Sequence, residues 1–305
     1  MTKPKNKRAP SNHAGLILLS LTGLGMCITF LLQGVDVALF NPKGLIASEQ
    51  HRLMIISAAL LLAITIPTLF LLYFFAWKYR ESNEKATHDP TAHHGKYFVF
   101  SLWAIPSVFM LLLASIMWPA THKLAPQKSI ASSAKPITIQ VVAMRWKWLF
   151  IYPEQNIATV NFVQVPVNTP VRFDLTADET PMSSFWIPNL GGQLYAMTGH
   201  QNQLNLIADT PGDYPGRSAE INGAGFSGMK FMARASSQAG FDQWVRDVKL
   251  SSGALDTTEY KKLLSPSKNN PAALYSQAES GLYDTLLKKY GGTHGQQPDQ
   301  AMGHE

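Results

Sequence analysis

Three long stretches without a single charged side chain constrain this sequence more than any other feature. They run over residues 14–35, 53–77 and 97–118. Each is longer than the roughly 20 residues with which an α-helix crosses about 30 Å of hydrocarbon. A bilayer offers the backbone no hydrogen-bond partners, so these stretches are predicted to be transmembrane helices. A buried helix of a soluble protein would be expected to carry a charged face, and none is present here.

Basic residues flank these stretches unequally, which predicts their orientation. Four precede the first stretch, four lie between the second and the third, and two lie between the first and the second: Lys3, Lys5, Lys7 and Arg8; Lys78, Arg80, Lys85 and Lys96; Lys43 and Arg52. Because cytoplasmic loops carry an excess of lysine and arginine, the N-terminus and the 78–96 loop are expected in the cytoplasm. Everything after residue 118 is then expected outside, and Pro67 and Pro106 are expected to kink the second and third helices.

The first stretch allows other interpretations. A basic start followed by an apolar run is also typical of a secretory signal, although this run is long and lacks a clear small-x-small cleavage site. Cys27 suggests bacterial lipidation, but Met26 before it is a poor match to the small residue expected there. We favour a retained helix, and cleavage and lipidation stay open.

The outer half changes from helical to strand-like patterning. After a polar connector at 123–136, short runs rich in β-branched and aromatic residues alternate with Pro, Gly, Asn and Asp, at 137–142, 160–167, 171–175, 204–208 and 229–235. This spacing predicts an external β-sandwich of about 100 residues. Helical spacing of apolar residues returns at 238, and further helices are expected at 258–264 and 271–290.

The predicted organisation therefore has five parts. They are a basic N-terminus with the first membrane segment or signal (1–35), a two-helix transmembrane hairpin (36–122), the β-sandwich (123–237), a helical C-terminal arm (238–290) and a disordered tail (291–305). Only 15% of the 305 residues are charged, against about 25% in soluble domains, which fits a membrane protein. The net charge of +6 comes from membrane-flanking groups, so nucleic-acid binding is not expected.

An aromatic run opens the sandwich. Residues 145–155 read RWKWLFIYPEQ, in which Trp146, Trp148, Phe150 and Tyr152 occupy alternate positions. Side chains of a strand alternate between its faces, so we expect one wholly aromatic face. Composition alone assigns that face to the sandwich core and to an interface with neighbouring helices.

A loop near the end of the sandwich carries a resemblance to a known family. Residues 218–229 read SAEINGAGFSGM, which is similar to the copper-binding loop of subunit II of the haem–copper respiratory oxidases. That loop has two cysteines flanking a glutamate, then a histidine and a methionine. Glu220 and Met229 match it, whereas the cysteine positions fall on Ser218 and Asn222 and the histidine position on Phe226.

The resemblance covers residues 36–250 and narrows to one branch of the family. The earlier copper histidine of the family precedes a Trp-x-x-Pro-like turn, and its position falls on Ser183 within MSSFWIP. The missing ligands, together with WKWLFIYPEQ, FSGMKF at 226–231 and FDQWV at 241–245, resemble the quinol-oxidising branch and most of all the cytochrome bo-type ubiquinol oxidases. The resemblance implies a cupredoxin-like sandwich on a transmembrane α-helical anchor of two or three helices.

Counting possible ligands supports a lost copper centre independently. Copper sites of this kind need soft thiolates and imidazoles. The single cysteine, Cys27, lies in the first membrane segment, and His200 is the only histidine between His122 and His294. We therefore expect no metal, cofactor or catalytic residue in the sandwich, with Met229 filling the core. The histidines of the 78–96 loop and of the tail are expected to be solvated, with incidental metal binding as the alternative: His88, His93, His94, His294 and His304.

The resemblance also implies a function and partners. It implies subunit II of a proton-pumping terminal oxidase in a bacterial cytoplasmic membrane, with the outer domain on the periplasmic face. The haems and the catalytic copper are expected in subunit I, and the partners are subunit I, smaller membrane subunits, ubiquinol and lipid. In copper-bearing relatives the position of Trp146 lies on the electron route, and here a structural role is expected because no copper supplies electrons.

This sequence departs from the family pattern at one position, and two alternative functions stay open. The family often has a proton-feeding carboxylate near the cytoplasmic start of its second membrane helix, a position that falls on Val99, with Lys96 or His94 as candidate replacements. The first rival is a membrane-anchored sandwich that serves as an assembly or binding module. The second is a cytochrome c oxidase subunit, against which the missing ligands argue.

Overall fold

The computed structural model describes residues 23, 37–86, 95–251 and 253–291. Apart from residue 23, the expected first membrane segment lies outside the described residues, as do the loop histidines at 88, 93 and 94 and the tail from 292. The chain divides into two compact units, 1–41 and 42–305, and every helix and strand below belongs to the second.

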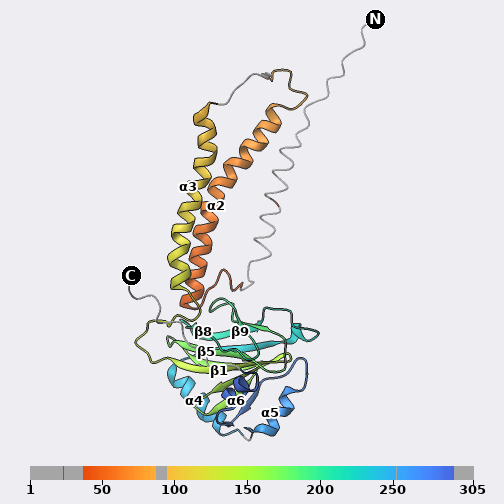
Figure 1. The fold of residues 1–305 in the computed structure, drawn as a ribbon. Coiled ribbons are helices and arrows are strands. Elements are labelled where there is room, and N and C mark those ends of the chain that lie inside the picture. Colours follow the sequence, from red (N-terminus) through yellow and green to blue (C-terminus); the bar gives the residue numbers. More distant parts are fainter. Residues whose placement is uncertain (1–22, 24–36, 87–94, 252, 292–305) are drawn as a thin grey trace. The chain divides into compact units, whose positions relative to one another are not determined.

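Two long apolar helices begin this unit (Figure 1). Helix α2 spans Leu45–Lys78 and helix α3 spans Lys96–Lys123, so both expected membrane helices are confirmed as helices long and apolar enough to cross a bilayer. They run antiparallel, and an ion pair of 2.9 Å between Glu49 and Lys123 joins the start of α2 to the end of α3. Pro67 lies inside α2, and both Pro106 and Pro119 lie inside α3.

Two sheets form the sandwich that follows. The first has the strand order β12-β3-β2-β1-β5-β8 and the second the order β4-β10-β9-β6-β7. The strands of the first sheet are β1 (Ile137–Met144), β2 (Lys147–Tyr152), β3 (Ile157–Val160), β5 (Val171–Ala177), β8 (Asn202–Leu206) and β12 (Ala273–Tyr275). Those of the second are β4 (Phe162–Pro166), β6 (Ser183–Trp186), β7 (Leu194–Ala196), β9 (Gly212–Ser218) and β10 (Lys230–Ser236). The five expected strands are confirmed as β1, β4, β5, β8 and β10, with ends that differ by a few residues.

An aromatic cluster fills the space between the sheets. Trp148 and Phe150 from β2 meet Phe185 from β6 and Phe231 from β10, with ring centroids 5.0–6.2 Å apart. Aromatic pairs at such separations add stability beyond the area that they bury. The alternation expected for β2 is therefore correct for Trp148, Phe150 and Tyr152, which are all fully buried.

The expectation that Trp146 lies on this strand is wrong. It precedes β2, in the turn between β1 and β2, with a positive φ of 65° that leaves the strand geometry. Its indole is partly buried and packs against the sandwich core from this turn.

The C-terminal segment departs from its expected form in one place. Helices α4 (Gln238–Lys249) and α5 (Thr257–Leu264) confirm the expectations, with side-chain caps from Ser237 and Asp256. The single helix expected at 271–290 is wrong: β12 and β13 (Gln277–Ala278) come first, and α6 covers only Leu282–Lys289. The physical reason is that β12 pairs with β3, which otherwise would be the open edge of the first sheet, and β13 pairs with β11 (Ala254–Leu255).

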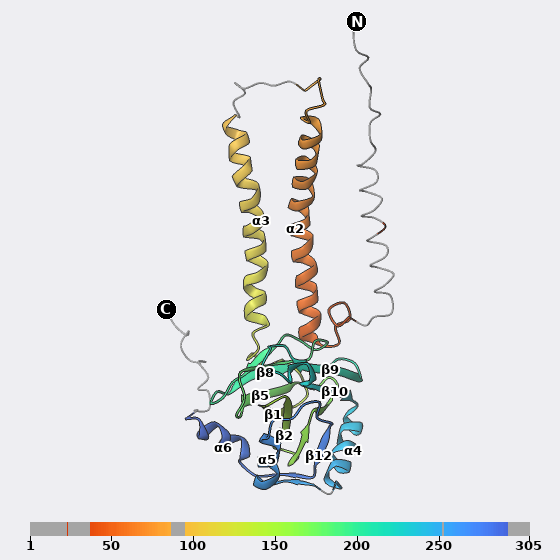
Figure 2. The ribbon, with the colours of Figure 1, turned by 90° about the vertical axis from the view of Figure 1, so that its right-hand side faces the viewer.

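Residues 253–291, called the C-terminal arm below, cover the outer face of the first sheet (Figure 2). Apolar side chains that β1, β2 and β3 turn away from the sandwich pack on side chains from α5, β12, β13 and α6: Val142, Met144, Leu149, Ile151, Ala158 and Val160 on Tyr260, Tyr275, Ala278, Tyr283, Leu286 and Leu287. The arm thus buries this face of the sheet over β1, β2 and β3. The arm is consequently a second layer of the folded domain.

Candidate functional site

The 218–229 loop connects β9 to β10 and closes on itself. The backbone N–H of Ser218 donates to the carbonyl of Met229 (3.1 Å), so the first and last residues of the loop are bonded together. Between them a single 3₁₀ turn, Phe226–Gly228, is fixed by hydrogen bonds from Phe226 N to Gly223 O and from Met229 N to Phe226 O. The loop therefore has a defined backbone course.

Three of the residues singled out from the sequence meet beneath this loop. The Nδ2 group of Asn222 donates to Ser183 Oγ (2.8 Å) and contacts Met229 Sδ (3.1 Å). Asn222 is 6% exposed, and Ser183 and Met229 are fully buried. Ser183 begins β6, 39 residues before Asn222 in the sequence, so the fold brings these positions together. The cluster Ser183–Asn222–Met229 is the centre of the candidate site.

The other singled-out residues stay at the margin of this cluster. The hydroxyl of Ser218 donates to the carbonyl of Glu220 (3.1 Å), which keeps that bond within the loop. Phe226 and Glu220 are partly buried. The expectation that Met229 fills the core agrees with its complete burial among the sandwich side chains.

The donor atoms of the cluster do not fit a copper centre. They are one thioether, one amide and one hydroxyl, whereas a dinuclear copper site and a blue copper site both require thiolate and imidazole ligands. His200 is exposed, outside the cluster. Among the described residues, no three or more His, Cys, Asp and Glu side chains form a group that could hold a metal ion. The cluster is therefore a set of buried side chains that hydrogen-bond to one another.

Trp146 lies directly on the loop. Its Nε1 donates to the carbonyl of Asn222 (3.3 Å), which links the turn between β1 and β2 to the centre of the site. The indole also lies against Gly225, where an added Cβ would come within 2.2 Å of ring atom Cδ2. Glycine at position 225 is thus what allows the indole to lie flat on the loop.

Comparison with known proteins identifies the family. The family model described as "Cytochrome C oxidase subunit II, periplasmic domain" matches residues 152–236, and the "COX Aromatic Rich Motif" matches residues 249–294. The "Cytochrome bo(3) ubiquinol oxidase subunit 2" of Pseudomonas putida is 46% identical over 275 residues, which cover 90% of this chain and 86% of that protein. This chain belongs to the ubiquinol oxidase subunit 2 family.

Two further members show the same extent of similarity. The protein of the same name from Pseudomonas aeruginosa is 43% identical over 89% of this chain and 82% of its own length. The "Ubiquinol oxidase subunit 2" of Acetobacter aceti is 42% identical over 92% of this chain and 90% of its own length. The resemblance inferred from the sequence is confirmed, as is the fold class of apolar helices, cupredoxin-like sandwich and short C-terminal arm with helices. The rival interpretation as an assembly or binding module finds no support.

Two buried charged residues of this subunit, Lys147 and Asp178, were not anticipated from the sequence. Lys147 at the start of β2 is 2% exposed, and its ammonium donates to the carbonyls of Leu263 (2.7 Å) and Ser265 (2.9 Å). Burial lowers its pKa. A lysine inside an otherwise apolar strand was the available signal. Asp178, just after β5, has a fully buried carboxylate, for which the local sequence gave no signal.

The position of the family carboxylate lies in the first turns of α3. Val99 is the fourth residue of that helix and 46% exposed, and Lys96 is its first residue. His94 lies outside the described residues. A substitute proton-entry group at Lys96 or His94 stays a prediction.

Proposed function

We propose that this chain is subunit II of a terminal ubiquinol oxidase complex that reduces oxygen to water and moves protons across a bacterial inner membrane. The names of its relatives support this substrate and this complex. In this proposal the haems and the catalytic copper belong to subunit I, and this chain contributes no catalytic residue. It has a multi-pass topology, with α2 and α3 in the bilayer beside subunit I and the sandwich on the periplasmic side.

The observation that carries the proposal is the chemistry of the Ser183–Asn222–Met229 cluster. Its atoms already hydrogen-bond to one another and include a single soft donor, so the cluster is unsuited to take electrons from a water-soluble donor onto a metal. Ubiquinol is lipid-soluble and delivers electrons within the membrane, so no external relay is needed. The role of this chain is then mechanical: it packs its helices against the catalytic subunit and covers its outer face.

Purification of the complex from native membranes tests the proposal. The chain should co-purify with a haem-bearing subunit, and the complex should consume oxygen with ubiquinol but not with reduced cytochrome c. Metal analysis should assign copper to the haem-bearing subunit alone. Rapid turnover with cytochrome c, without an added haem subunit, contradicts the proposal, as does isolation of this chain without any haem.

A further inference from the structure

The turn between β1 and β2, residues 143–147 and here called the Trp146 tip, is held from the side of β5. The backbone N–H of Asp178 donates to the carbonyl of Ala143 (2.9 Å). The Nε of Arg145 donates to the carbonyl of Glu179 (2.9 Å). Residues 178–179 therefore fix the first half of the tip.

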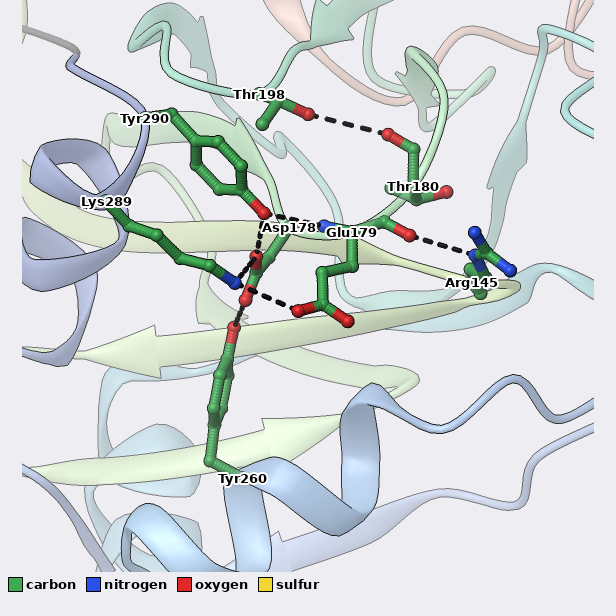
Figure 3. Close-up of polar contacts among 8 residues, drawn as sticks. All are labelled: Arg145, Asp178, Glu179, Thr180, Thr198, Tyr260, Lys289 and Tyr290. Carbon is green, nitrogen blue, oxygen red and sulfur yellow. Dashed lines mark hydrogen bonds and ion pairs between the residues drawn. The ribbon is translucent and has the colours of Figure 1, made fainter.

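The same two residues fasten the C-terminal arm (Figure 3). The buried carboxylate of Asp178 accepts hydrogen bonds from Tyr260 of α5 (2.5 Å), from Tyr290 after α6 (2.6 Å) and from the ammonium of Lys289 (2.9 Å). Lys289 also donates to the carboxylate of Glu179 (3.0 Å). Charge-assisted hydrogen bonds are short and strong, and here three of them converge on one side chain. The support of Arg145 is thus tied to the arm.

The second half of the tip is attached to the arm directly. The ammonium of Lys147 donates to the carbonyls of Leu263 and Ser265, at the end of α5. The last carbonyls of a helix have no partner within it, and a cation stabilises them. Lys147 therefore joins the first residue of β2 to the C-terminal end of α5.

Trp146 itself, between these two anchors, meets the loop that follows α5. The ammonium of Lys268 lies 5.7 Å from the centroid of the indole ring, a cation–π distance. The side-chain oxygen of the neighbouring Asn269 comes within 2.2 Å of where a Cβ on Gly228 would lie. Asn161 Nδ2 donates to the carbonyl of Asn270 (2.9 Å) and fastens this stretch to the sandwich. Residues 268–269 thus touch both the indole and the 3₁₀ turn of the 218–229 loop.

The backbone of Trp146 shows that its position is imposed by its surroundings. A bulky residue rarely adopts a positive φ, here 65°, because its Cβ then approaches the following carbonyl. Such a conformation persists only where neighbouring structure over-determines it. The contacts that do so come from the arm, from residues 178–179 and from the 218–229 loop.

We propose that the C-terminal arm positions Trp146, that Lys268 is a positioning residue for the indole, and that the arm thereby holds the 218–229 loop. The link to the loop is the hydrogen bond from Trp146 to the carbonyl of Asn222. Where a metal-bearing loop is cross-linked by its ligands, this one is clamped from outside by the arm. The inference goes beyond the proposed function and does not depend on which electron donor the complex uses.

Hydrogen–deuterium exchange on the purified complex tests the proposal. Lys268→Met removes the cation and keeps an unbranched side chain, Lys268→Arg retains a cation, and Lys261→Met is a matched control on the exposed side of α5. Exchange in peptides covering 143–147 and 222–229 should rise about two- to five-fold in Lys268→Met, the size that an exposed cation–π contact supports. Lys268→Arg and Lys261→Met should exchange at the wild-type rate, because the first keeps the cation and the second changes a side chain outside the contact with Trp146. A merely steric role of Lys268 would leave Lys268→Met at the wild-type rate as well.

A second variant removes the Asp178 anchor of the arm instead of the contact between Lys268 and Trp146. Asp178→Asn should speed exchange in α5 and α6 and, by at least about ten-fold, at 143–147 and 222–229, since it frees the arm as a unit. If the Asp178→Asn complex does not assemble, Tyr290→Phe removes one of the three bonds and should shift both regions in the same direction. Unchanged exchange in Lys268→Met overturns the proposal, as does an arm that loosens while the tip and the 218–229 loop keep their wild-type rates. Failure of the proposed function would appear separately, as oxygen consumption with the wrong donor.

Discussion

Replacement of Asp178 by asparagine should detach the C-terminal arm from the sandwich. The carboxylate is completely buried and accepts hydrogen bonds from the two tyrosine hydroxyls and one ammonium described above. Asparagine keeps the size of the side chain, but its amide offers one oxygen and turns a donor toward groups that also donate. The variant therefore loses both the charge and the geometry of the cluster.

The magnitude follows from the number and burial of these bonds. A hydrogen bond to a charged group contributes about 1.5–3 kcal/mol, and loss of one partner from a buried ion pair costs about 3–5 kcal/mol. The side chain of Lys289 is 41% exposed, so solvent screens its share and the tyrosines supply most of the effect. We expect the free energy of arm docking to fall by about 3–5 kcal/mol, a large part of the roughly 5–15 kcal/mol that stabilises a domain.

The assay is hydrogen exchange of α5 and α6 in the purified complex, together with the thermal unfolding midpoint of the outer domain. Asp242→Asn is the control, because Asp242 is an exposed carboxylate on α4 that accepts a hydrogen bond from Gln238. Its effect should stay within about 0.5 kcal/mol. If α5 and α6 exchange as slowly in Asp178→Asn as in Asp242→Asn, the reasoning about a carboxylate anchor is refuted.

Three further predictions concern ionisation, topology and packing. Burial is the main cause that raises the pKa of five tyrosines outside the membrane helices: Tyr152, Tyr260, Tyr275, Tyr283 and Tyr290. Since the folded-state pKa exceeds the unfolded value, the contribution of these tyrosines to stability is complete below about pH 10 and is lost as the pH rises through the folded values. A 295 nm difference titration of wild type against Tyr260→Phe should therefore show no step near pH 10, where an unperturbed tyrosine would ionise. Reporter fusions after Glu84 and after Gln140 should lie in opposite compartments, as eight basic residues at the two inner ends against two in the outer loop require, and a shared compartment would disprove the topology. Gly225→Ala should lower stability by about 1–3 kcal/mol in thermal unfolding, because its Cβ would meet the indole of Trp146, whereas equal stability of Gly225→Ala and the exposed neighbour variant Ser227→Ala would contradict the packing described.

The helices and most strands could be predicted because each follows from a local rule. The absence of charge over 53–77 and 97–118 is a requirement of the bilayer, and α2 and α3 contain these ranges entirely. Alternation identified β2 from Trp148 onward because every second side chain enters the core. Local rules failed at 271–290, where edge pairing of β12 with β3 outweighed a helical pattern.

The candidate site could be predicted only in part. The resemblance to the copper-binding positions of the family pointed to Ser183, Asn222 and Met229, and the fold brings these three residues into contact. The polar anchors of the arm were missed because Lys147 and Asp178 find their partners 82–118 residues away along the chain. No periodicity or motif encodes contacts at such sequence separation.

The cluster itself indicates why the loop needs support from outside. Asn222 Oδ1 is buried and has no hydrogen-bond partner among the described residues, and an unsatisfied buried polar atom costs about 1–3 kcal/mol. An apolar side chain would avoid that cost, so the cluster by itself is a poor stabiliser of the loop. The compensation has to come from contacts around it, and those are the Trp146 indole on Gly225 and the arm residues behind the indole. Loss of the arm should therefore lower the local stability of the 218–229 loop before that of the sandwich core, because the aromatic side chains of the core pack independently of the arm.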